Sequence, residues 1–250
     1  MIKKPVKPAD LIKASDLMQL ESKIQKKRLK ALYSFSNKNI KSYLPVEKKL
    51  IILIDIVGFS KKDTYSQWQG IMVFQQYLRT RVIANCFLKK IHVSHFIPTG
   101  DGCYIIADEC KPEVALDFVY SIVKGFQNVQ PQDEYELSLR ASALLGDAVP
   151  FMDLAMHKNY IGEGMNEGSR VLSGGQKALE EQFVKECEKE GRPSPQNEEI
   201  KSFSRNSVFV DDSLSQYVEK FSRECKIYSF KDVADKHGKT RNITAMQGIH

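Results

Sequence analysis

Two aspartates, Asp55 and Asp101, lie at the ends of predicted strands, where their carboxylates can come close together. Asp55 lies near the end of an apolar, β-branched run, Leu50–Ser60, which is typical of a strand buried on both faces. A carboxylate in such a run is costly unless it is paired or binds a metal. Asp101 lies between two further apolar runs, Ile91–Ile97 and Cys103–Ala107, which we expect to form a hairpin with this aspartate near its turn. Two such carboxylates can hold two divalent cations about 4 Å apart.

Glycines and a helical pair of polar residues extend this pattern. Gly58 and the glycines beside Asp101 allow a phosphate chain to come close to the backbone. Asn166 and Arg170 are four residues apart, so they share one face of a helix that begins near Gly162. Each feature alone has an ordinary explanation, because a strand-end aspartate is usually a cap or turn residue and Gly-Asp-Gly is a common turn. The three segments together carry more weight than any one of them.

In this order the segments resemble the class III nucleotidyl cyclases, the adenylate and guanylate cyclase superfamily. The matching segments are Asp55–Ser60, Gly100-Asp101 and Gly162–Arg170, and their order and spacing match from about residue 46 to the C-terminus. The resemblance implies an enzyme that joins the ribose 3′-hydroxyl of a nucleoside triphosphate to its own α-phosphorus and releases pyrophosphate.

The resemblance also assigns roles to residues. It implies that Asp55, Asp101 and the Ile56 carbonyl hold two divalent cations, Mg²⁺ or Mn²⁺, as cofactors. It implies that Asn166 positions the ribose and that Arg170 offsets the charge of the reacting phosphate. In this family the metal ligands come from one subunit and the asparagine and arginine from the other. A homodimer with two shared sites is therefore expected.

The triphosphate is expected at the loop that follows the first strand. Backbone N–H groups from Ile56 to Ser60, including those of Gly58 and Phe59, precede a helix and can cradle phosphates. The resemblance further implies a phosphate-binding lysine near the C-terminal strands, for which Lys231 is the candidate.

At the two positions where class III cyclases recognise the base of the nucleotide, this chain has neither the adenylate nor the guanylate cyclase residues. Adenylate cyclases usually carry lysine and aspartate there, and guanylate cyclases glutamate and cysteine, whereas this chain has Ile97 and Asn159. In this it resembles the pyrimidine cyclases of the bacterial Pycsar anti-phage systems, whose cyclic CMP or cyclic UMP acts on a separate effector protein. We therefore predict a cytidylate or uridylate cyclase of anti-phage defence. The alternatives are a purine cyclase with an atypical base pocket and an inactive nucleotide-binding regulator.

Composition bears on the partners and the compartment. The net charge of +6, from 37 basic and 31 acidic residues, suits an anionic substrate, and no basic patch interleaved with aromatics argues for nucleic acid. The five cysteines include no C-x-x-C pair, which is typical of a reduced, cytoplasmic protein. No apolar run approaches the length of a membrane span. Asp147, His92, His95 and His157 have spacings that fit no tight set of metal ligands.

The remaining patterns predict two parts and an α+β fold. Residues 1–45 are expected to form an N-terminal arm with a helix over Pro8–Leu32, and residues 46–250 the catalytic domain. The order strand-helix-strand-strand-helix-strand predicts a ferredoxin-like βαββαβ core with a mixed or antiparallel sheet. The resemblance adds extra C-terminal strands. A charged segment from about 175 to 206 is expected to be a solvated insertion, or a helix plus linker.

Two local predictions can be compared directly with the structure. Thr64-x-x-Gln67 has the form of a capping box and should begin a helix that runs to about Lys90. The apolar residues at helical spacing that should face the sheet are Trp68, Ile71, Met72, Leu78 and Val82. A strand is predicted from about Glu136 to Leu145, where Gly146-Asp147 should turn the chain.

Overall fold

A computed structural model describes residues 45–89, 91–127, 137–154, 157–235 and 238–248, together with Lys23. The chain divides into two units, Met1–Pro45 and Val46–His250, and every element discussed below belongs to the second. Lys23 apart, the helix predicted over Pro8–Leu32 lies outside the described residues.

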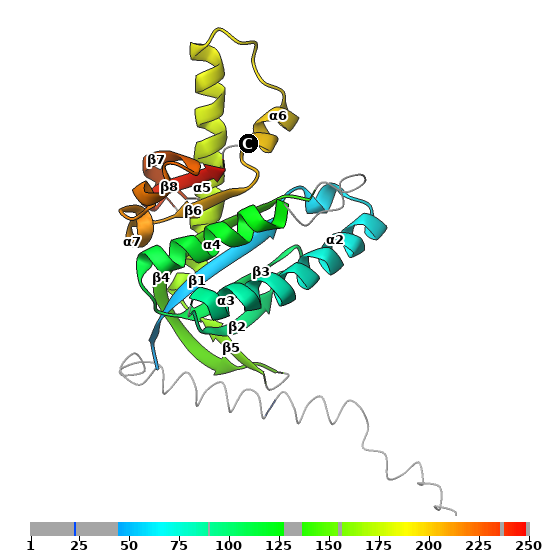
Figure 1. Cartoon of the computed structure of the whole chain (residues 1–250), viewed down its shortest axis with the longest axis vertical. Helices are drawn as coiled ribbons and strands as arrows, with labels where there is room; N and C mark the ends of the chain where they lie inside the picture. The colour runs from blue at the N-terminus through cyan, green and yellow to red at the C-terminus, as the bar shows by residue number, and fades with distance from the viewer. Residues whose placement is uncertain are drawn as a thin grey trace, which may run out of the picture. The chain divides into compact units, whose positions relative to one another are not determined.

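One mixed sheet forms the centre of the second unit (Figure 1). Seven strands follow one another in the order β2-β3-β1-β4-β6-β8-β7, and β5 pairs with β4 beside this path. Neighbouring strands are antiparallel except for the parallel pair of β4 and β6. The strands are β1 (Glu47–Ile56), β2 (Val93–Pro98), β3 (Gly102–Asp108), β4 (Leu139–Met152), β5 (Lys158–Ile161), β6 (Ser207–Val210), β7 (Cys225–Ala234) and β8 (Thr240–Gly248).

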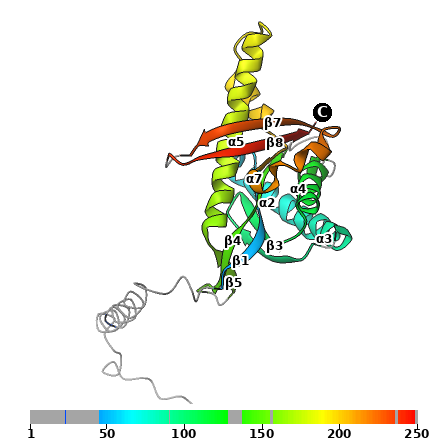
Figure 2. The ribbon, with the colours of Figure 1, turned by 90° about the vertical axis from the view of Figure 1, so that its left-hand side faces the viewer.

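Helices cover both faces of this sheet, with α5 on one side and α2, α3 and α4 on the other (Figure 2). The helices are α2 (Thr64–Tyr77), α3 (Ile83–Lys89), α4 (Pro112–Gln127), α5 (Glu163–Lys189), α6 (Asn197–Phe203) and α7 (Asp212–Ser215). The elements from β1 to β4 follow the βαββαβ order, and β6, β7 and β8 are added after it. The predicted α+β class and the ferredoxin-like core with extra C-terminal strands are confirmed.

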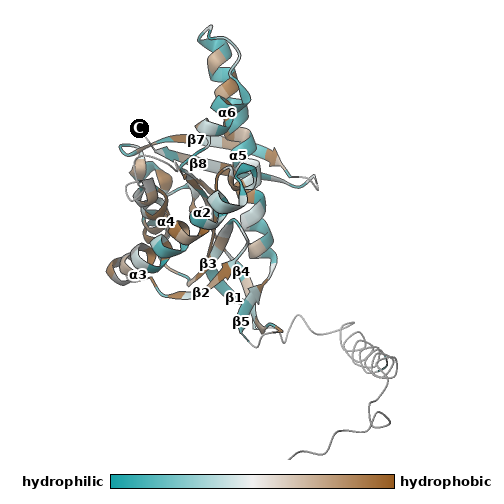
Figure 3. Cartoon of the chain, turned by 90° about the vertical axis from the view of Figure 1, so that its right-hand side faces the viewer, coloured by the Kyte–Doolittle hydropathy of each residue, from teal (hydrophilic) through white to brown (hydrophobic). Residues whose placement is uncertain are grey.

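The first strand, β1, is buried on both faces, as its apolar sequence predicted. Leu50 and Ile52 are fully buried in the core beneath α4, and Ile51 is fully buried in a second core beneath α5. Successive side chains of a strand point to opposite faces, so a strand between two helical layers needs apolar residues at every position. Figure 3 shows hydrophobic residues gathered in the sheet and in α3 and α4, and mainly hydrophilic ones on α5 beyond the sheet.

The helix after β1 is capped differently from the prediction. Asp63 is the N-cap, and its carboxylate accepts hydrogen bonds from the N–H groups of Tyr65 and Ser66 at 3.0 and 3.1 Å. The predicted capping box at Thr64 is therefore wrong by one residue. The continuous helix predicted to Lys90 is interrupted by a π-helical turn, η4 (Leu78–Val82), between α2 and α3.

The buried face of α2 also differs in part from the prediction. Leu78 and Val82 are buried as expected, but the side chains of Trp68 and Met72 are 59% and 50% exposed. The residues that face the sheet from α2 are Ser66, Gly70, Phe74 and Tyr77. A Cβ atom at Gly70 would lie 3.6 Å from Leu137, an ordinary van der Waals distance, so the packing of α2 does not require glycine at this position.

The strand predicted to end at Leu145 continues to Met152. Gly146-Asp147 does not turn the chain, and β4 goes on to pair with β5, a strand that the prediction missed. The reason is a close crossing, because a Cβ atom at Gly146 would lie 3.0 Å from the Cα of Gly164 in α5. The glycine here allows a helix to lie against the strand, and it does not mark a turn.

The charged segment from about 175 to 206 is a helix followed by a linker. α5 has 27 residues and ends at Lys189, and α6 follows a short linker. The segment is not solvated throughout, since Leu179 and Cys187 are buried. Phe183 of α5 stacks on Phe203 of α6 with ring centroids 4.3 Å apart, which fastens the two helices together. Among the described residues no helix is both long and apolar enough to cross a bilayer.

Candidate active site

The two aspartates predicted as metal ligands meet at one end of β1. Asp55 lies opposite Gly102 in the pairing of β1 with β3, and the Ile56 N–H donates to the Asp101 carbonyl at 3.0 Å. A Cβ atom at Gly102 would lie 2.0 Å from the Ile54 carbonyl oxygen, so only glycine allows the hairpin to come this close to β1. The Gly-Asp-Gly turn thus holds its carboxylate beside Asp55.

The charge around Asp55 favours a bound cation. Burial raises the pKa of its carboxyl group, Arg140 opposes that shift, and the nearby Asp101 adds to it, so that the pKa is raised. Two adjacent carboxylates and the Ile56 carbonyl are oxygen donors of the kind that Mg²⁺ and Mn²⁺ prefer. No group of three or more histidine, cysteine or acidic side chains suited to a metal occurs among the described residues. Further ligands would therefore come from substrate and water, which is common for Mg²⁺.

Arg140 is a residue of this site that the sequence analysis missed. It lies on β4 directly opposite Asp55, and its Nε and Nη2 atoms are 2.8 and 2.5 Å from the Asp55 Oδ2 atom. Its Nη1 atom donates to Gln176 of α5. Both partners of the ion pair are largely buried, with side chains 20% and 15% exposed. The signal was available, because an arginine in an apolar strand demands a partner just as Asp55 does.

The loop after β1 opens into a hollow of about 540 Å³. Its lining residues are Val57, Gly58, Ser60, Lys61, Lys62, Ser138, Arg140, Gln176, Glu198, Lys201 and Arg205. The N–H groups of Ile56 and Val57 are already bonded to the carbonyls of Asp101 and Ser138, so the predicted phosphate cradle does not begin at Ile56. Within the described part of the chain, the N–H groups of residues 58–60 have no such acceptor.

Gly58 and the turn η3 (Phe59–Lys61) shape the mouth of this hollow. Gly58 has a φ of 72°, which turns the chain sharply after β1. The Phe59 side chain packs on the core near Gly70 and so anchors the loop. The amide of Gln67 donates to the Lys62 carbonyl at 3.0 Å, which ties the loop to α2.

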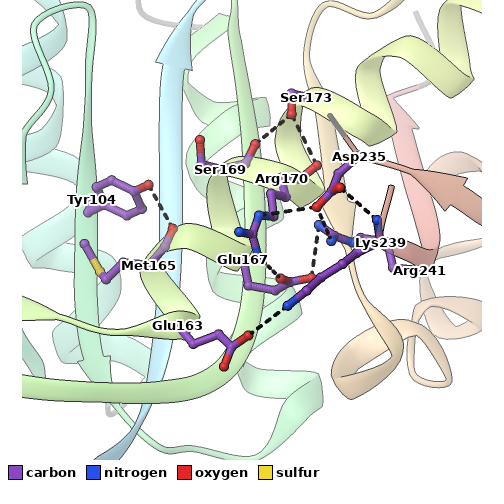
Figure 4. A network of polar contacts seen from close by, with 10 residues as sticks. All are labelled: Tyr104, Glu163, Met165, Glu167, Ser169, Arg170, Ser173, Asp235, Lys239 and Arg241. Carbon is purple, nitrogen blue, oxygen red and sulfur yellow. Dashed lines mark hydrogen bonds and ion pairs between the residues drawn. The ribbon is translucent and has the colours of Figure 1, made fainter. Parts of the chain in front are cut away.

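Asn166 and Arg170 lie in a different part of the same chain. Arg170 pairs with Glu167 and with Asp235 at 3.4 Å each, and Arg241 of β8 contacts the same two carboxylates at 3.1 and 2.9 Å (Figure 4). Asn166 is exposed one helical turn earlier. Neither Asp235 nor Arg241 was predicted from the sequence, because no spacing links them to Arg170.

The position of α5 separates this network from Asp55 within one chain. Gln176, which contacts Arg140 at the Asp55 end, comes ten residues after Asn166 in α5. At 1.5 Å per residue that is about 15 Å along the helix for Asn166, and about 9 Å for Arg170, which precedes Gln176 by six residues. The structure therefore brings Asp55 and Asp101 together and leaves Asn166 and Arg170 apart from them.

The two predicted base-reading residues come from neighbouring strands. Ile97 is half-buried on β2 and Asn159 half-buried on β5. These strands meet where the rings of His95 and Tyr160 lie 6.3 Å apart. The Asn159 Oδ1 atom accepts a hydrogen bond from the Tyr160 N–H at 2.8 Å, which fixes the amide with its NH₂ group as the free donor.

Lys231, the predicted phosphate-binding lysine, lies away from the Asp55 hollow. It is exposed on β7 and lines a separate hollow between α5 and β7, together with Gly174 and Lys177. The hollows beside Asp55 and beside Lys231 have no lining residue in common.

The same fold occurs in solved nucleotidyl cyclase domains. The chain matches no protein-family profile and no curated protein. The catalytic core of a rhodopsin-guanylyl cyclase with converted specificity, in complex with ATPαS, matches with a TM-score of 0.54 and 14% identity over 82% of this chain and 99% of that one. The guanylate cyclase domain of RhGC from Catenaria anguillulae, in complex with GTP, matches with a TM-score of 0.52 and 14% identity over 82% and 98%. The adenylyl cyclase CyaB from P. aeruginosa matches with a TM-score of 0.53 and 13% identity over 83% and 98%. The chain thus has the fold of the class III cyclase catalytic domains.

Proposed function

We propose that this chain is a nucleotidyl cyclase that converts a nucleoside triphosphate to its 3′,5′-cyclic monophosphate and pyrophosphate. The observation that carries the proposal is the meeting of Asp55 and Asp101 at the end of β1, beside Arg140 and the open N–H groups of residues 58–60. A paired carboxylate site next to a basic hollow suits a triphosphate held with divalent cations. The structural neighbours in complex with GTP and ATPαS support a nucleotide in this fold.

The residues at the end of β1 and in the loop after it would have different roles in an in-line displacement at the α-phosphorus. Asp55, Asp101 and the Ile56 carbonyl would hold two Mg²⁺ or Mn²⁺ ions, which lower the pKa of the 3′-hydroxyl and neutralise charge on the phosphates. Arg140 now pairs with Asp55, and its planar guanidinium would be suited to bind phosphate oxygens if the Asp55 carboxylate held a cation. The N–H groups of Gly58, Phe59 and Ser60 would hold the same phosphate chain.

The proposal includes a homodimer in which each site is shared. Asn166 and Arg170 precede Gln176, at the Asp55 end, by about 15 and about 9 Å along α5, so in this proposal a second copy brings them to the metals. Arg170 would offset charge on the reacting phosphate and Asn166 would hold the ribose. Asp235 and Glu167 keep the Arg170 guanidinium ordered for this role. Lys231 would bind the triphosphate across the same interface.

We further propose a pyrimidine substrate, with CTP favoured over UTP. Because the Asn159 carbonyl oxygen is bonded to the Tyr160 N–H, its NH₂ group is the part of the amide that would be left to donate to a base. A donor complements the N3 acceptor of cytosine, whereas N3 of uracil is itself a donor. Ile97 adds apolar bulk that narrows the pocket. Resemblance alone supports the wider role, a cytoplasmic source of cyclic CMP or cyclic UMP that acts on a separate effector protein in anti-phage defence.

A purine cyclase is the second candidate, because the named structural neighbours are guanylyl and adenylyl cyclases. Purified chain is incubated with Mn²⁺ and an equimolar mixture of ATP, GTP, CTP and UTP, and the cyclic products are separated by chromatography. We expect one pyrimidine product to dominate. A purine product in excess would overturn the base assignment and leave the cyclase assignment standing. No cyclic product, in a protein that still binds a triphosphate, would favour the inactive regulator.

A further inference from the structure

α6 and the residues after it line the hollow beside Asp55. Lys201 of α6 and Arg205, just beyond its end, share the hollow with Arg140, Lys61 and Lys62. They belong to the segment that follows α5, far along the chain from the loop after β1. We propose that Lys201 and Arg205 bind the terminal phosphates of the substrate and the pyrophosphate product. This inference rests on the cyclase function proposed above.

The end of this segment is fixed beside Arg140. The N–H of Asn206 donates to the Leu139 carbonyl at 2.8 Å, and Leu139 is the residue before Arg140. Asn206 is buried and has a φ of 55°, a conformation that asparagine tolerates better than most residues. Arg205 therefore leaves the backbone at a determined point on the rim of the hollow.

A chain of hydrogen bonds also joins the segment to Asp55. Arg140 bridges Asp55 and Gln176, and the Gln176 amide donates to the Glu180 Oε1 atom at 2.7 Å. The hydroxyl of Ser204, which is fully buried, donates to the same oxygen at 3.1 Å. The rim of the hollow and the carboxylate that would bind metal are thus positioned by one network.

The charge of the hollow suits a phosphate chain. Five cationic side chains line it against one carboxylate, Glu198. Lys201 is exposed, and no ion pair involves it within the described part of the chain. Lysine binds phosphate as a point charge and arginine in a bidentate manner, so the pair can hold oxygens of two phosphates.

A small polyanion fits this hollow better than a nucleic acid strand. Among the residues that the structure describes, no aromatic side chain lines it, and sequence-tolerant binding of single strands depends on aromatic stacking. The hollow adjoins the site of Asp55 and Asp101, where cations would hold the α-phosphate. The β- and γ-phosphates then extend toward α6, and pyrophosphate leaves from the same place.

The test measures binding of inorganic tripolyphosphate with Mg²⁺ to the full chain by calorimetry, which needs no turnover. Lys201→Gln should weaken binding about 3–10-fold, since one exposed charge contact is lost. Glu198→Gln should tighten it about 2–3-fold by removing the opposing charge. Lys189→Gln is the matched control, because Lys189 is an exposed lysine in the last turn of α5 outside the hollow. All of these differences should shrink as the salt concentration rises.

Cyclase assays on the same variants separate this inference from the proposed function. In an active enzyme, Lys201→Gln should raise both KM for the nucleotide and the inhibition constant of pyrophosphate. Equal tripolyphosphate affinity of Lys201→Gln, Lys189→Gln and the wild type would overturn the inference, whatever the activity. Weaker binding by Lys201→Gln in a chain that makes no cyclic nucleotide would support the phosphate site while overturning the cyclase proposal.

Discussion

Two clusters of charged residues in this molecule, one around Asp55 and one around Arg170, differ in how their charges are paired. Around Asp55 burial raises the pKa of the carboxyl group, Arg140 opposes the shift and Asp101 adds to it, and a hollow lined by cationic side chains lies alongside. Around Arg170 two arginines and two carboxylates pair with one another, and the Asp235 side chain is only 6% exposed. The first cluster favours added cations and phosphates, whereas the second holds a guanidinium in place.

The two clusters form in different ways within one chain. Asp55 and Asp101 converge because adjacent strands carry them. Asn166 and Arg170 lie on α5, which packs on the face of β1 that carries Ile51 and Leu53 and contacts Arg140 at Gln176, six residues beyond Arg170. Two half-sites of this kind are complementary when a second copy supplies the missing half.

The largest expected effect comes from removing a carboxylate of the first cluster. Asp101→Ala should lower turnover on the order of 10³-fold or more, since metal-ion catalysis contributes several kcal/mol. Initial rates with CTP and Mn²⁺ provide the measurement. Asp55→Ala should be equally inactive but less stable, by about 1–3 kcal/mol, because it leaves the Arg140 guanidinium buried without its partner. Near-normal turnover of Asp101→Ala would refute the two-metal assignment.

Mixing inactive variants tests whether the two clusters act across an interface. Asp101→Ala subunits combined with Arg170→Ala subunits should recover about a quarter of wild-type turnover, because half of the dimers are mixed and each has one intact site. The control is Asp101→Ala mixed with Asp55→Ala, which leaves every site without a metal ligand and should stay inactive. If neither mixture recovers although subunit exchange is verified, the two clusters do not share a site.

A smaller effect is expected at the base. Asn159→Ala removes a hydrogen-bond donor that we assign to the pyrimidine, and about 1–3 kcal/mol of discrimination between bases should be lost. The ratio of kcat/KM for CTP to that for each other triphosphate is the measurement. Asn159→Asp replaces the donor with an acceptor and should turn preference away from CTP. An unchanged ratio in both variants would show that this residue does not read the base.

The smallest expected effect is on the free energy of unfolding of the metal-free chain and on how it depends on pH. Because the folded-state pKa of Asp55 is raised, its contribution to stability is present below about pH 4 and is lost as pH rises through that pKa. Asp101→Asn removes a like charge and should stabilise the metal-free chain by about 0.5 kcal/mol at pH 7. Denaturant unfolding should show this difference at pH 7 and none in acid. With Mg²⁺ added, the wild type should become more stable than Asp101→Asn, because the ion should bind and stabilise only the wild type strongly.

Much of the fold followed from local patterns, and the errors have identifiable causes. The alternation of β1 between two cores, the hairpin of β2 and β3, and the start of α5 at Gly162 depend on residues close in sequence. The turn predicted at Gly146-Asp147 was wrong because that glycine serves a contact with Gly164 in a distant helix. The outward face at Trp68 was missed because helical spacing alone does not fix which side of α2 packs on the sheet, and the structure buries Ser66, Phe74 and Tyr77 instead.

Local sequence patterns already identify the candidate chemical groups: two strand-end carboxylates, a glycine-containing loop and an asparagine–arginine pair at helical spacing. Which of these groups lie together follows from the way the strands pair and the helices pack. Arg140 reaches Asp55 through strand pairing across 85 residues, and Lys201 and Arg205 reach the same hollow because a backbone hydrogen bond fixes Asn206 at β4. Periodicity and turn chemistry act over a few residues, whereas the convergence of charges depends on strand order and helix crossing, which no local pattern records.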